Sequence, residues 1–172
     1  GPLGVYGRSK LAGEGAVMAA CPRALIFRTS WVYSPFGANF VKTMLRYGRE
    51  REVMRVVDDQ QGNPTSALDI ADAILRLSPG LDAESTGGIY HLCGEGSTTW
   101  CGFARHIFEI SEGLGGPHPR VEAIATADYP TPAKRPANSR MATDAFAERF
   151  GFRLRPWREA TAETVARLLQ QG

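Results

Sequence analysis

The chain has 172 residues, of which 43% are hydrophobic and 22% charged, and its 20 Lys and Arg against 18 Asp and Glu leave a net charge of +2. A chain of this length can bury a sizeable hydrophobic core without disulfide or metal support. With no apolar run near the ~20 residues of a membrane span, no secretory leader and no Lys/Arg cluster, the sequence favours a cytoplasmic protein without membrane or nucleic-acid partners.

The cysteines and histidines give no sign of a metal centre. Cys21, Cys93 and Cys101 are widely spaced and contain no Cys-x-x-Cys pair, so the sequence predicts buried, reduced thiols rather than a disulfide framework or a zinc site. His106 and His118 likewise have no partner at metal-ligand spacing.

Helix and strand patterns alternate from the start of the chain. Residues 5–20 are rich in Ala, Leu, Lys and Glu, with apolar residues near the helical period, which predicts a helix that ends before Pro22. The short apolar run of residues 24–27 predicts a strand buried on both faces of a parallel sheet. Further patterns predict helices over residues 39–47 and 67–77, and strands over residues 53–57 and 88–93.

Polar residues and Gly/Pro clusters set the boundaries in the rest of the chain. Ser66 and either Thr98 or Thr99 precede helix patterns, and we expect their hydroxyls to cap free amide groups there. The second of these helices places Phe103, Ile107 and Ile110 on one face. The next segments are predicted to be a loop over residues 113–119, a strand over 121–125 and an irregular stretch over 128–138. A short helix capped by Thr143 and ended by Gly151 follows, and the last helix spans residues 157–169 with Val165, Leu168 and Leu169 facing inward. The alternation predicts an α/β architecture.

Tyr6 and Lys10 are the first candidate for chemistry. Their four-residue spacing on the predicted first helix places both side chains on one face. An adjacent ammonium stabilises a phenolate, and a tyrosine activated in this way can donate a proton to a carbonyl oxygen as hydride arrives at the carbon. The plain alternative is an amphipathic helix with an exposed aromatic residue and a lysine.

The surrounding segments carry a family resemblance. Residues 5–14 (VYGRSKLAGE), followed by the strand that ends in residues 28–33 (RTSWVY), resemble the active-site segment of the extended short-chain dehydrogenase/reductase superfamily. Residues 59–66 (DQQGNPTS), 88–94 (GIYHLCG) and 135–139 (RPANS) make the chain similar to the dTDP-4-dehydrorhamnose reductases. These segments follow that family's order and spread over nearly the whole chain.

The resemblance implies reduction of the 4-keto group of dTDP-4-dehydro-6-deoxy-L-mannose to dTDP-L-rhamnose by NADPH or NADH. It implies that Tyr6 protonates the 4-keto oxygen and that Lys10 holds the nicotinamide ribose. In the same way, Arg28, Thr29 and Ser30 would lie along the nicotinamide, Trp31 would form an apolar wall against the hexose, and Asn39, Gln60 and Arg135 would face the nucleotide and its diphosphate. Some members use magnesium, but no ligand positions are assigned to this chain.

Several of these residues also have a structural interpretation. Arg28 and Arg135 fit solvated positions at a strand end and in a loop, and Trp31 fits a core residue. The adjacent carboxylates Asp58 and Asp59 fit a turn cap better than acid/base work or a metal site. His91 lies in an apolar strand, where a hydrogen-bonded core histidine is expected rather than a ligand.

One segment that is typical of the family is missing from this sequence. No Gly-rich dinucleotide-binding turn follows an apolar strand, so the chain is expected to be the C-terminal portion of a Rossmann-like enzyme whose N-terminal half is missing. We expect residues 1–34 to be a remnant of the dinucleotide-binding domain. Residues 35–172 are expected to form mainly the smaller substrate-binding lobe, with some elements returning to the Rossmann sheet.

Two further expectations follow from the missing half. Without it, the strand over residues 24–27 loses neighbours, which predicts coverage by self-association as a dimer or a swapped arrangement. The chain alone is also predicted to be inactive. The competing functions are another sugar-nucleotide epimerase or dehydratase, which would use the same tyrosine and lysine, and a non-catalytic regulatory subunit of the same fold.

Overall fold

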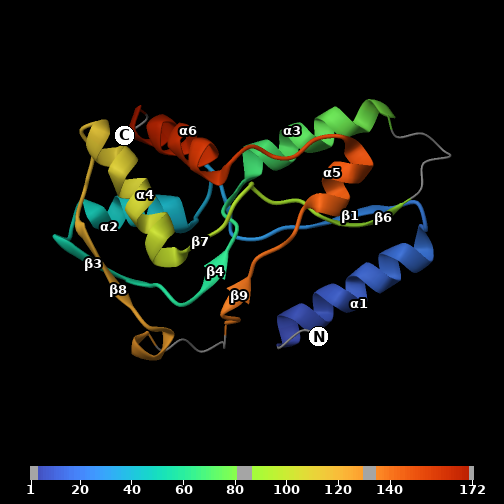
Figure 1. The fold of residues 1–172 in the computed structure, drawn as a ribbon, viewed down its shortest axis with the longest axis horizontal. Helices are drawn as coiled ribbons and strands as arrows, with labels where there is room; N and C mark the ends of the chain where they lie inside the picture. The colour runs from blue at the N-terminus through green and yellow to red at the C-terminus, as the bar shows by residue number, and fades with distance from the viewer. Residues whose placement is uncertain (1–3, 81–86, 130–134, 171–172) are drawn as a thin grey trace.

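The computed structural model describes residues 4–80, 87–129 and 135–170, and its elements form two groups that lie side by side (Figure 1). One group holds α2 (Phe40–Gly48), β3 (Val53–Val57), α4 (Trp100–Gly113), β8 (Arg120–Ile124) and α6 (Trp157–Gln170). The other holds α1 (Val5–Ala20), β1 (Leu25–Arg28), α3 (Ala67–Leu77), β6 (Gly88–His91) and α5 (Asp144–Phe150). The short elements are β2 (Val32–Tyr33), β4 (Gln61–Gly62), β5 (Thr65–Ser66), η1 (Ser78–Gly80), β7 (Thr98–Thr99), η2 (Thr126–Asp128) and β9 (Asn138–Ser139).

Parallel pairing of distant strands confirms the α/β class. β1 pairs with β6, so Leu25 lies opposite Gly88, and β3 pairs with β8 over five residues on each strand. β2 and β5 are also parallel, whereas β4 lies between antiparallel β7 and parallel β9. Parallel strands require long crossovers, which here contain the helices. The chain therefore returns to β1 after leaving it for the group that contains β3.

Two of the predicted helix caps are present. The Ser66 hydroxyl accepts from the backbone amide of Asp69 at the start of α3, and the Thr99 hydroxyl accepts from the Gly102 amide, 2.9 Å away, at the start of α4. Gly151 ends α5 with a φ of +76°, a left-handed conformation that glycine adopts without steric cost. The predicted cap by Thr143 is wrong, because its hydroxyl is the partner of the Arg153 guanidinium at 3.0 Å.

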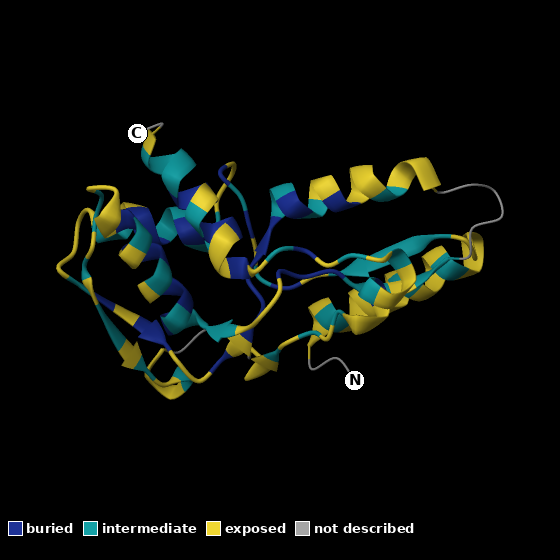
Figure 2. Cartoon of the chain, turned by 45° about the horizontal axis from the view of Figure 1, so that its top comes forward, coloured by how far each residue is buried: buried dark blue, intermediate teal, exposed yellow. Residues whose placement is uncertain are grey.

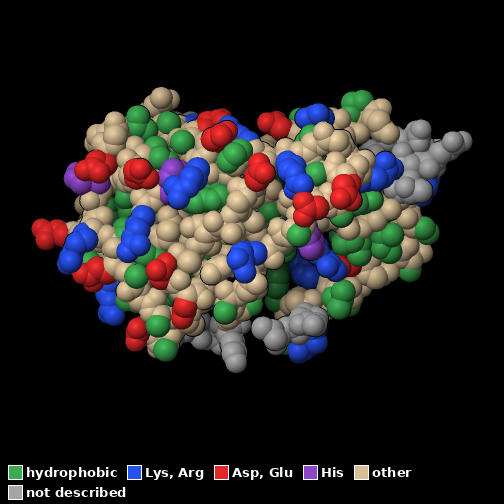
Figure 3. Space-filling view, viewed as in Figure 1, with side chains coloured by type: hydrophobic (Ala, Val, Ile, Leu, Met, Phe, Trp, Pro, Cys, Tyr) green, Lys and Arg blue, Asp and Glu red, His purple; other side chains and the backbone are tan. Residues whose placement is uncertain are grey.

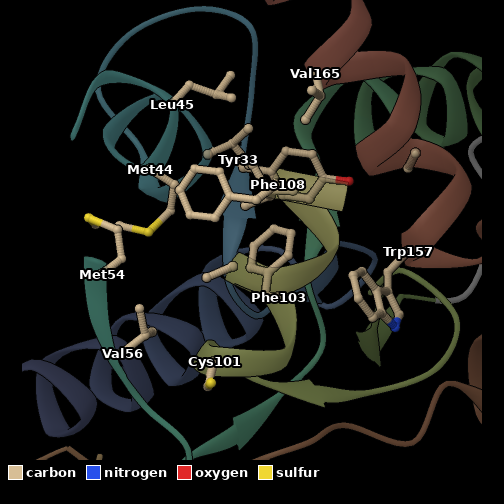
Figure 4. Close-up of a cluster of buried hydrophobic side chains, with 14 residues drawn as sticks. Tyr33, Met44, Leu45, Met54, Val56, Cys101, Phe103, Phe108, Trp157 and Val165 are labelled. Carbon is tan, nitrogen blue, oxygen red and sulfur yellow. The ribbon is translucent and has the colours of Figure 1, made fainter. Parts of the chain in front are cut away.

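The larger hydrophobic core joins α2, α4, α6 and β3. Figure 4 shows Phe103 and Phe108 of α4 in one cluster with Met44 of α2 and Val165 of α6. The predicted apolar face of α4 is confirmed, since Phe103 and Ile107 are fully buried and Ile110 packs against the cluster. Val165 is buried as predicted, while Leu168 and Leu169 are partly buried against the same core.

A smaller core holds the other group together. Ala73 of α3, Leu92 and Phe146 of α5 are buried there, and Phe27 of β1 contacts Phe146 edge to face with ring centroids 5.9 Å apart. Helices α3 and α5 therefore cover the β1–β6 pair. This packing holds Phe27, near the end of β1, against α5.

Helix α1 is the one α-helix in the described ranges that has no buried residue. None of its residues is buried, and Figure 2 shows it exposed along much of its length. The expectation that the following strand is buried on both faces is wrong: all four residues of β1 are partly exposed, because β6 is its one strand partner in the described residues. Cys21, between α1 and β1, is exposed rather than buried as predicted, whereas Cys93 and Cys101 are buried free thiols as predicted.

Hydrophobic side chains gather over the end of the molecule that carries α1 (Figure 3). Val5, Leu11 and Val17 of this helix are each about half or more exposed. Of the helices in the described ranges, none combines the length and apolar character that crossing a membrane would require.

Candidate functional site

Helix α1 presents Tyr6 and Lys10 on the same side. The two residues are one helical turn apart, and the Lys10 ammonium nitrogen lies 5.6 Å from the centroid of the Tyr6 ring. Both side chains are exposed, Tyr6 to 76%. A phenol and an ammonium held this close to each other are available together to a ligand that approaches α1.

The end of β1 is tied to α1 by an ion pair. The Arg28 guanidinium donates two parallel hydrogen bonds to the Glu14 carboxylate, with the Nε–Oε1 distance at 2.8 Å. The hydrogen bond from Arg28 is the largest cause that holds the pKa of Glu14 below its ordinary value, and burial opposes it. The bidentate geometry gives this contact a defined orientation. Arg28 therefore joins β1 to the helix that carries Tyr6 and Lys10.

The two residues after Arg28 have different surroundings. Thr29 is exposed, whereas Ser30 is buried and its hydroxyl donates to the backbone oxygen of Ser139 in β9, 3.3 Å away. This contact brings the segment after β1 next to the 135–139 segment. The segment after β1 follows the carboxyl end of a parallel strand, where open α/β sheets place ligands.

Trp31 occupies a strained position between the two groups of elements. Its φ of +48° is the one positive value at a non-glycine residue in the described ranges, and such a conformation costs about 1–3 kcal/mol. Its indole stacks on Trp100, the first residue of α4, with ring centroids 3.6 Å apart and planes 11° from parallel. The Cε2, Nε1 and Cζ2 atoms of the indole approach Gly62 of β4. Sequence reasoning singled out Trp31 and missed Trp100, and it named Gly62 only as part of the segment of residues 59–66.

A cavity of about 440 Å³ lies beside this stack. Gln60 and Arg135, two residues expected to face the nucleotide, both line it, together with Trp100. The Gln60 side chain is buried, and its amide nitrogen donates to the Thr126 hydroxyl at 3.0 Å. The remaining walls combine aromatic, basic and aliphatic side chains: Phe40, Thr43, Met44, Tyr47, Arg51, Met54, Arg55, Val56, Val57 and Tyr129.

Asn39 has its polar atoms engaged at the start of α2. Its carbonyl oxygen accepts from the Lys42 amide, and its amide nitrogen donates to the backbone oxygens of Ser34 and Phe36. The residue caps the helix whose next residue, Phe40, lines the cavity. A capping asparagine is common at this position, so the sequence signal for a ligand contact here also fits a purely local role.

The carboxylates of Asp58 and Asp59 hold neighbouring segments together. Asp59 accepts from the backbone amide and hydroxyl of Thr126, and these hydrogen bonds lower the pKa of Asp59. Asp58 accepts from the Thr99 hydroxyl. His91 is hydrogen-bonded as expected, with Nδ1 3.0 Å from the oxygen of Ala142, but it is partly exposed rather than in the core. Within residues 4–80, 87–129 and 135–170, no three His, Cys, Asp or Glu side chains are grouped to hold a metal ion.

The expected site residues thus fall into two sets. Tyr6, Lys10 and Arg28 lie on α1 and the end of β1, while Trp31, Gln60 and Arg135 lie near or in the cavity bordered by Trp100. The contribution of Tyr129, Arg51 and Arg55 to the cavity was not found from the sequence. Their segments contain no motif that distinguishes them from solvated loop and strand residues.

Comparison with known proteins gives consistent matches. A family model described as RmlD substrate binding domain matches residues 1–170. A dTDP-4-dehydrorhamnose reductase from Sinorhizobium fredii is 46% identical over 175 residues, which is 100% of this chain and 59% of that protein.

Solved structures agree with this match. The dTDP-4-dehydrorhamnose reductase of Clostridium acetobutylicum gives a TM-score of 0.87 at 35% identity, covering 99% of this chain and 57% of that one. The Bacillus anthracis protein of the same name, in complex with NADP, gives a TM-score of 0.85 at 33% identity. That match covers 97% of this chain and 56% of the Bacillus anthracis chain. The chain therefore spans less than two thirds of the length of these proteins.

Proposed function

Because the chain belongs to the family of RmlD substrate binding domains, we propose that it forms the substrate-binding part of a reductase. The enzyme would convert dTDP-4-dehydro-6-deoxy-L-mannose to dTDP-L-rhamnose in the cytoplasm, with NADPH or NADH as the reductant. The name of the Sinorhizobium fredii relative and the NADP in the Bacillus anthracis structure support this reaction and this class of cofactor.

The juxtaposition of Tyr6 and Lys10 carries the proposal. The Tyr6 hydroxyl donates its proton to the 4-keto oxygen of the sugar as the carbonyl carbon is reduced. The Lys10 ammonium, whose nitrogen lies 5.6 Å from the Tyr6 ring centroid, favours the phenolate that this transfer leaves behind. When bound, the nicotinamide supplies the hydride. Lys10 also donates to its ribose, and Thr29 and Ser30 line the same region.

The cavity beside Trp100 is proposed to hold the nucleotide. Arg135 pairs with the diphosphate, since a planar guanidinium matches two phosphate oxygens. The aromatic rings that line the cavity offer faces for the base, and Gln60 adds an amide for hydrogen bonding. Trp31, beside the cavity, provides the apolar wall for the hexose.

The dinucleotide-binding part is proposed to come from further polypeptide of the kind that the longer relatives contain. This chain covers 59% of the Sinorhizobium fredii protein, and we expect it to have no reductase activity by itself. The exposed apolar side chains of α1 support the expectation that the isolated chain self-associates. A monodisperse monomer in light scattering would contradict that expectation.

The decisive experiment is a reconstituted hydride transfer. The chain is mixed with the dinucleotide-binding half of the Sinorhizobium fredii relative as a second polypeptide, and consumption of reduced nicotinamide is followed with the 4-keto sugar nucleotide. We expect turnover from the mixture, none from either part alone, and its loss with Tyr6→Phe. Substantial turnover by the chain alone would refute the proposal that the reaction needs a separate dinucleotide-binding part.

Titration of dTDP into the chain separates the competing functions. A substrate-binding lobe binds the nucleotide, so absence of binding would contradict the proposal. Binding of dTDP without turnover in a mixture that forms a stable complex would favour a non-catalytic subunit. Conversion of the 4-keto sugar without consumption of reduced nicotinamide would favour an epimerase or dehydratase.

A further inference from the structure

We propose that Trp100 and Gly62 are positioning residues for Trp31, the residue assigned above to the wall of the hexose site. The inference rests on the proposed function in one respect, namely that Trp31 faces the sugar. It adds Trp100, which no sequence motif pointed to, and Gly62, which lies in the segment of residues 59–66 but had no role assigned to it. One of them, Trp100, also belongs to the cavity proposed for the nucleotide.

The backbone of Trp31 requires support from its surroundings. A bulky residue with a φ of +48° persists where neighbouring contacts over-determine its conformation, and such positions cluster at functional sites. Two contacts here come from distant segments: the Thr65 amide donates to the Trp31 oxygen at 3.2 Å, and Trp100 covers one face of the indole. The stack is close and nearly parallel, which leaves the ring little freedom to tilt.

Gly62 limits the position of the Trp31 indole along the edge that carries Nε1 and Cζ2. A Cβ at this position would lie 2.6 Å from the indole nitrogen of Trp31 and 2.7 Å from its Cζ2, distances at which something must move. Gly62 is not among the described glycines with positive φ, so its backbone conformation does not demand glycine. It lies in β4, paired with Thr98 of β7 and Ser139 of β9, so the strand cannot shift without breaking two pairings. Glycine inside a strand commonly marks such a close approach.

Trp100 connects this arrangement to the cavity. It stacks on Trp31, lines the cavity with Gln60 and Arg135, and contacts the Phe40 ring, with centroids 4.7 Å apart. The Trp100 indole therefore both supports Trp31, the proposed wall of the hexose site, and lines the proposed nucleotide cavity. A nucleotide that contacts Trp100 would therefore also hold Trp31 in position for the sugar of the same ligand.

The geometry can be tested without ligand. Two stacked indoles give an exciton-coupled signal in circular dichroism, and the chain has three tryptophans. We expect Trp31→Phe to abolish the couplet and Trp157→Phe to retain it. Gly62→Ala should then reduce the couplet strongly, while the matched Gly113→Ala, whose Cβ would meet open space, leaves it unchanged. An intact couplet in folded Gly62→Ala would overturn the role of Gly62.

The functional consequence is measured as the ratio of the dissociation constants of dTDP and dTDP-L-rhamnose. In the 172-residue chain, Gly62→Ala should leave the dTDP constant unchanged and lower this ratio about threefold to tenfold, because the sugar loses an aromatic contact. Gly113→Ala should leave both constants unchanged. An unchanged ratio in Gly62→Ala would contradict the inference, whereas a wild-type ratio of one would instead contradict the proposed sugar contact of Trp31.

A double-mutant cycle covers the case in which Gly62→Ala does not fold. If Trp100 acts through Trp31, Trp100→Leu lowers the ratio in the wild-type background and has no further effect on it in Trp31→Ala. Independent, additive losses would show that Trp100 contacts the ligand without positioning Trp31, and the inference would fail.

Discussion

The guanidinium of Arg28 and the carboxylate of Glu14 form a bidentate ion pair between the end of β1 and helix α1. Because no residue of α1 is buried, this contact has a large share in fixing the helix that carries Tyr6 and Lys10. An arginine expected at the cofactor thus has a second role, which its sequence position did not reveal.

Removal of that ion pair should loosen α1. Glu14→Gln is expected to raise amide hydrogen exchange in residues 5–20 while lowering the free energy of unfolding by about 1 kcal/mol or less, as for other partly exposed pairs. Glu109→Gln, which removes a more exposed contact to His106 on α4, should leave exchange in residues 5–20 unchanged. Equal exchange in Glu14→Gln and the wild type would show that other contacts hold the helix.

The same pair predicts an acid dependence of stability. The hydrogen bond from Arg28 holds the pKa of Glu14 below its ordinary 4.5, so the folded state is stabilised above that pH and loses this contribution as the pH falls through the folded-state pKa. Thermal unfolding of the wild type and Glu14→Gln should therefore differ near neutral pH and converge in acid. A difference that grows below pH 4.5 would have the wrong sign.

Tyr33 provides a test of the larger core. Its hydroxyl lies 3.0 Å from the Thr161 hydroxyl, and burial is the main cause that raises the pKa of this phenol. Tyr33→Phe should lower the free energy of unfolding by about 1 kcal/mol, the usual net value of one hydrogen bond, because Thr161 still donates to the Trp157 oxygen. Tyr129→Phe, at a position 58% exposed, is the control and should be neutral in chemical denaturation. A loss of several kcal/mol in Tyr33→Phe would point to a wider buried network.

Arg135 should matter for nucleotide binding rather than folding. Arg135→Gln is expected to weaken dTDP binding about tenfold or more, since a charge-assisted hydrogen bond contributes about 1.5–3 kcal/mol. Arg153→Gln removes a guanidinium of similar exposure that pairs with Asp144 away from the cavity, and calorimetry should show unchanged binding. If both variants lose affinity equally, the effect reflects net charge and not a contact in the cavity.

Local sequence was sufficient for what depends on neighbours in the chain. The hydroxyls of Ser66 and Thr99 cap the helices that follow them, and the spacing of Tyr6 and Lys10 brings those side chains together, because both effects act within one helical turn. The alternation of helices and parallel strands was readable for the same reason. Helical and strand periodicities are properties of short segments.

Contacts between distant segments were decided by tertiary packing alone. The stack of Trp31 on Trp100, its closeness to Gly62 and the pairing of Arg28 with Glu14 depend on how separate elements are placed, which no local pattern encodes. The same holds for exposure: the apolar run of β1 predicted full burial, yet burial requires neighbouring elements as well as apolar side chains. Periodicity specifies the face that a segment offers, and only the fold specifies what covers it.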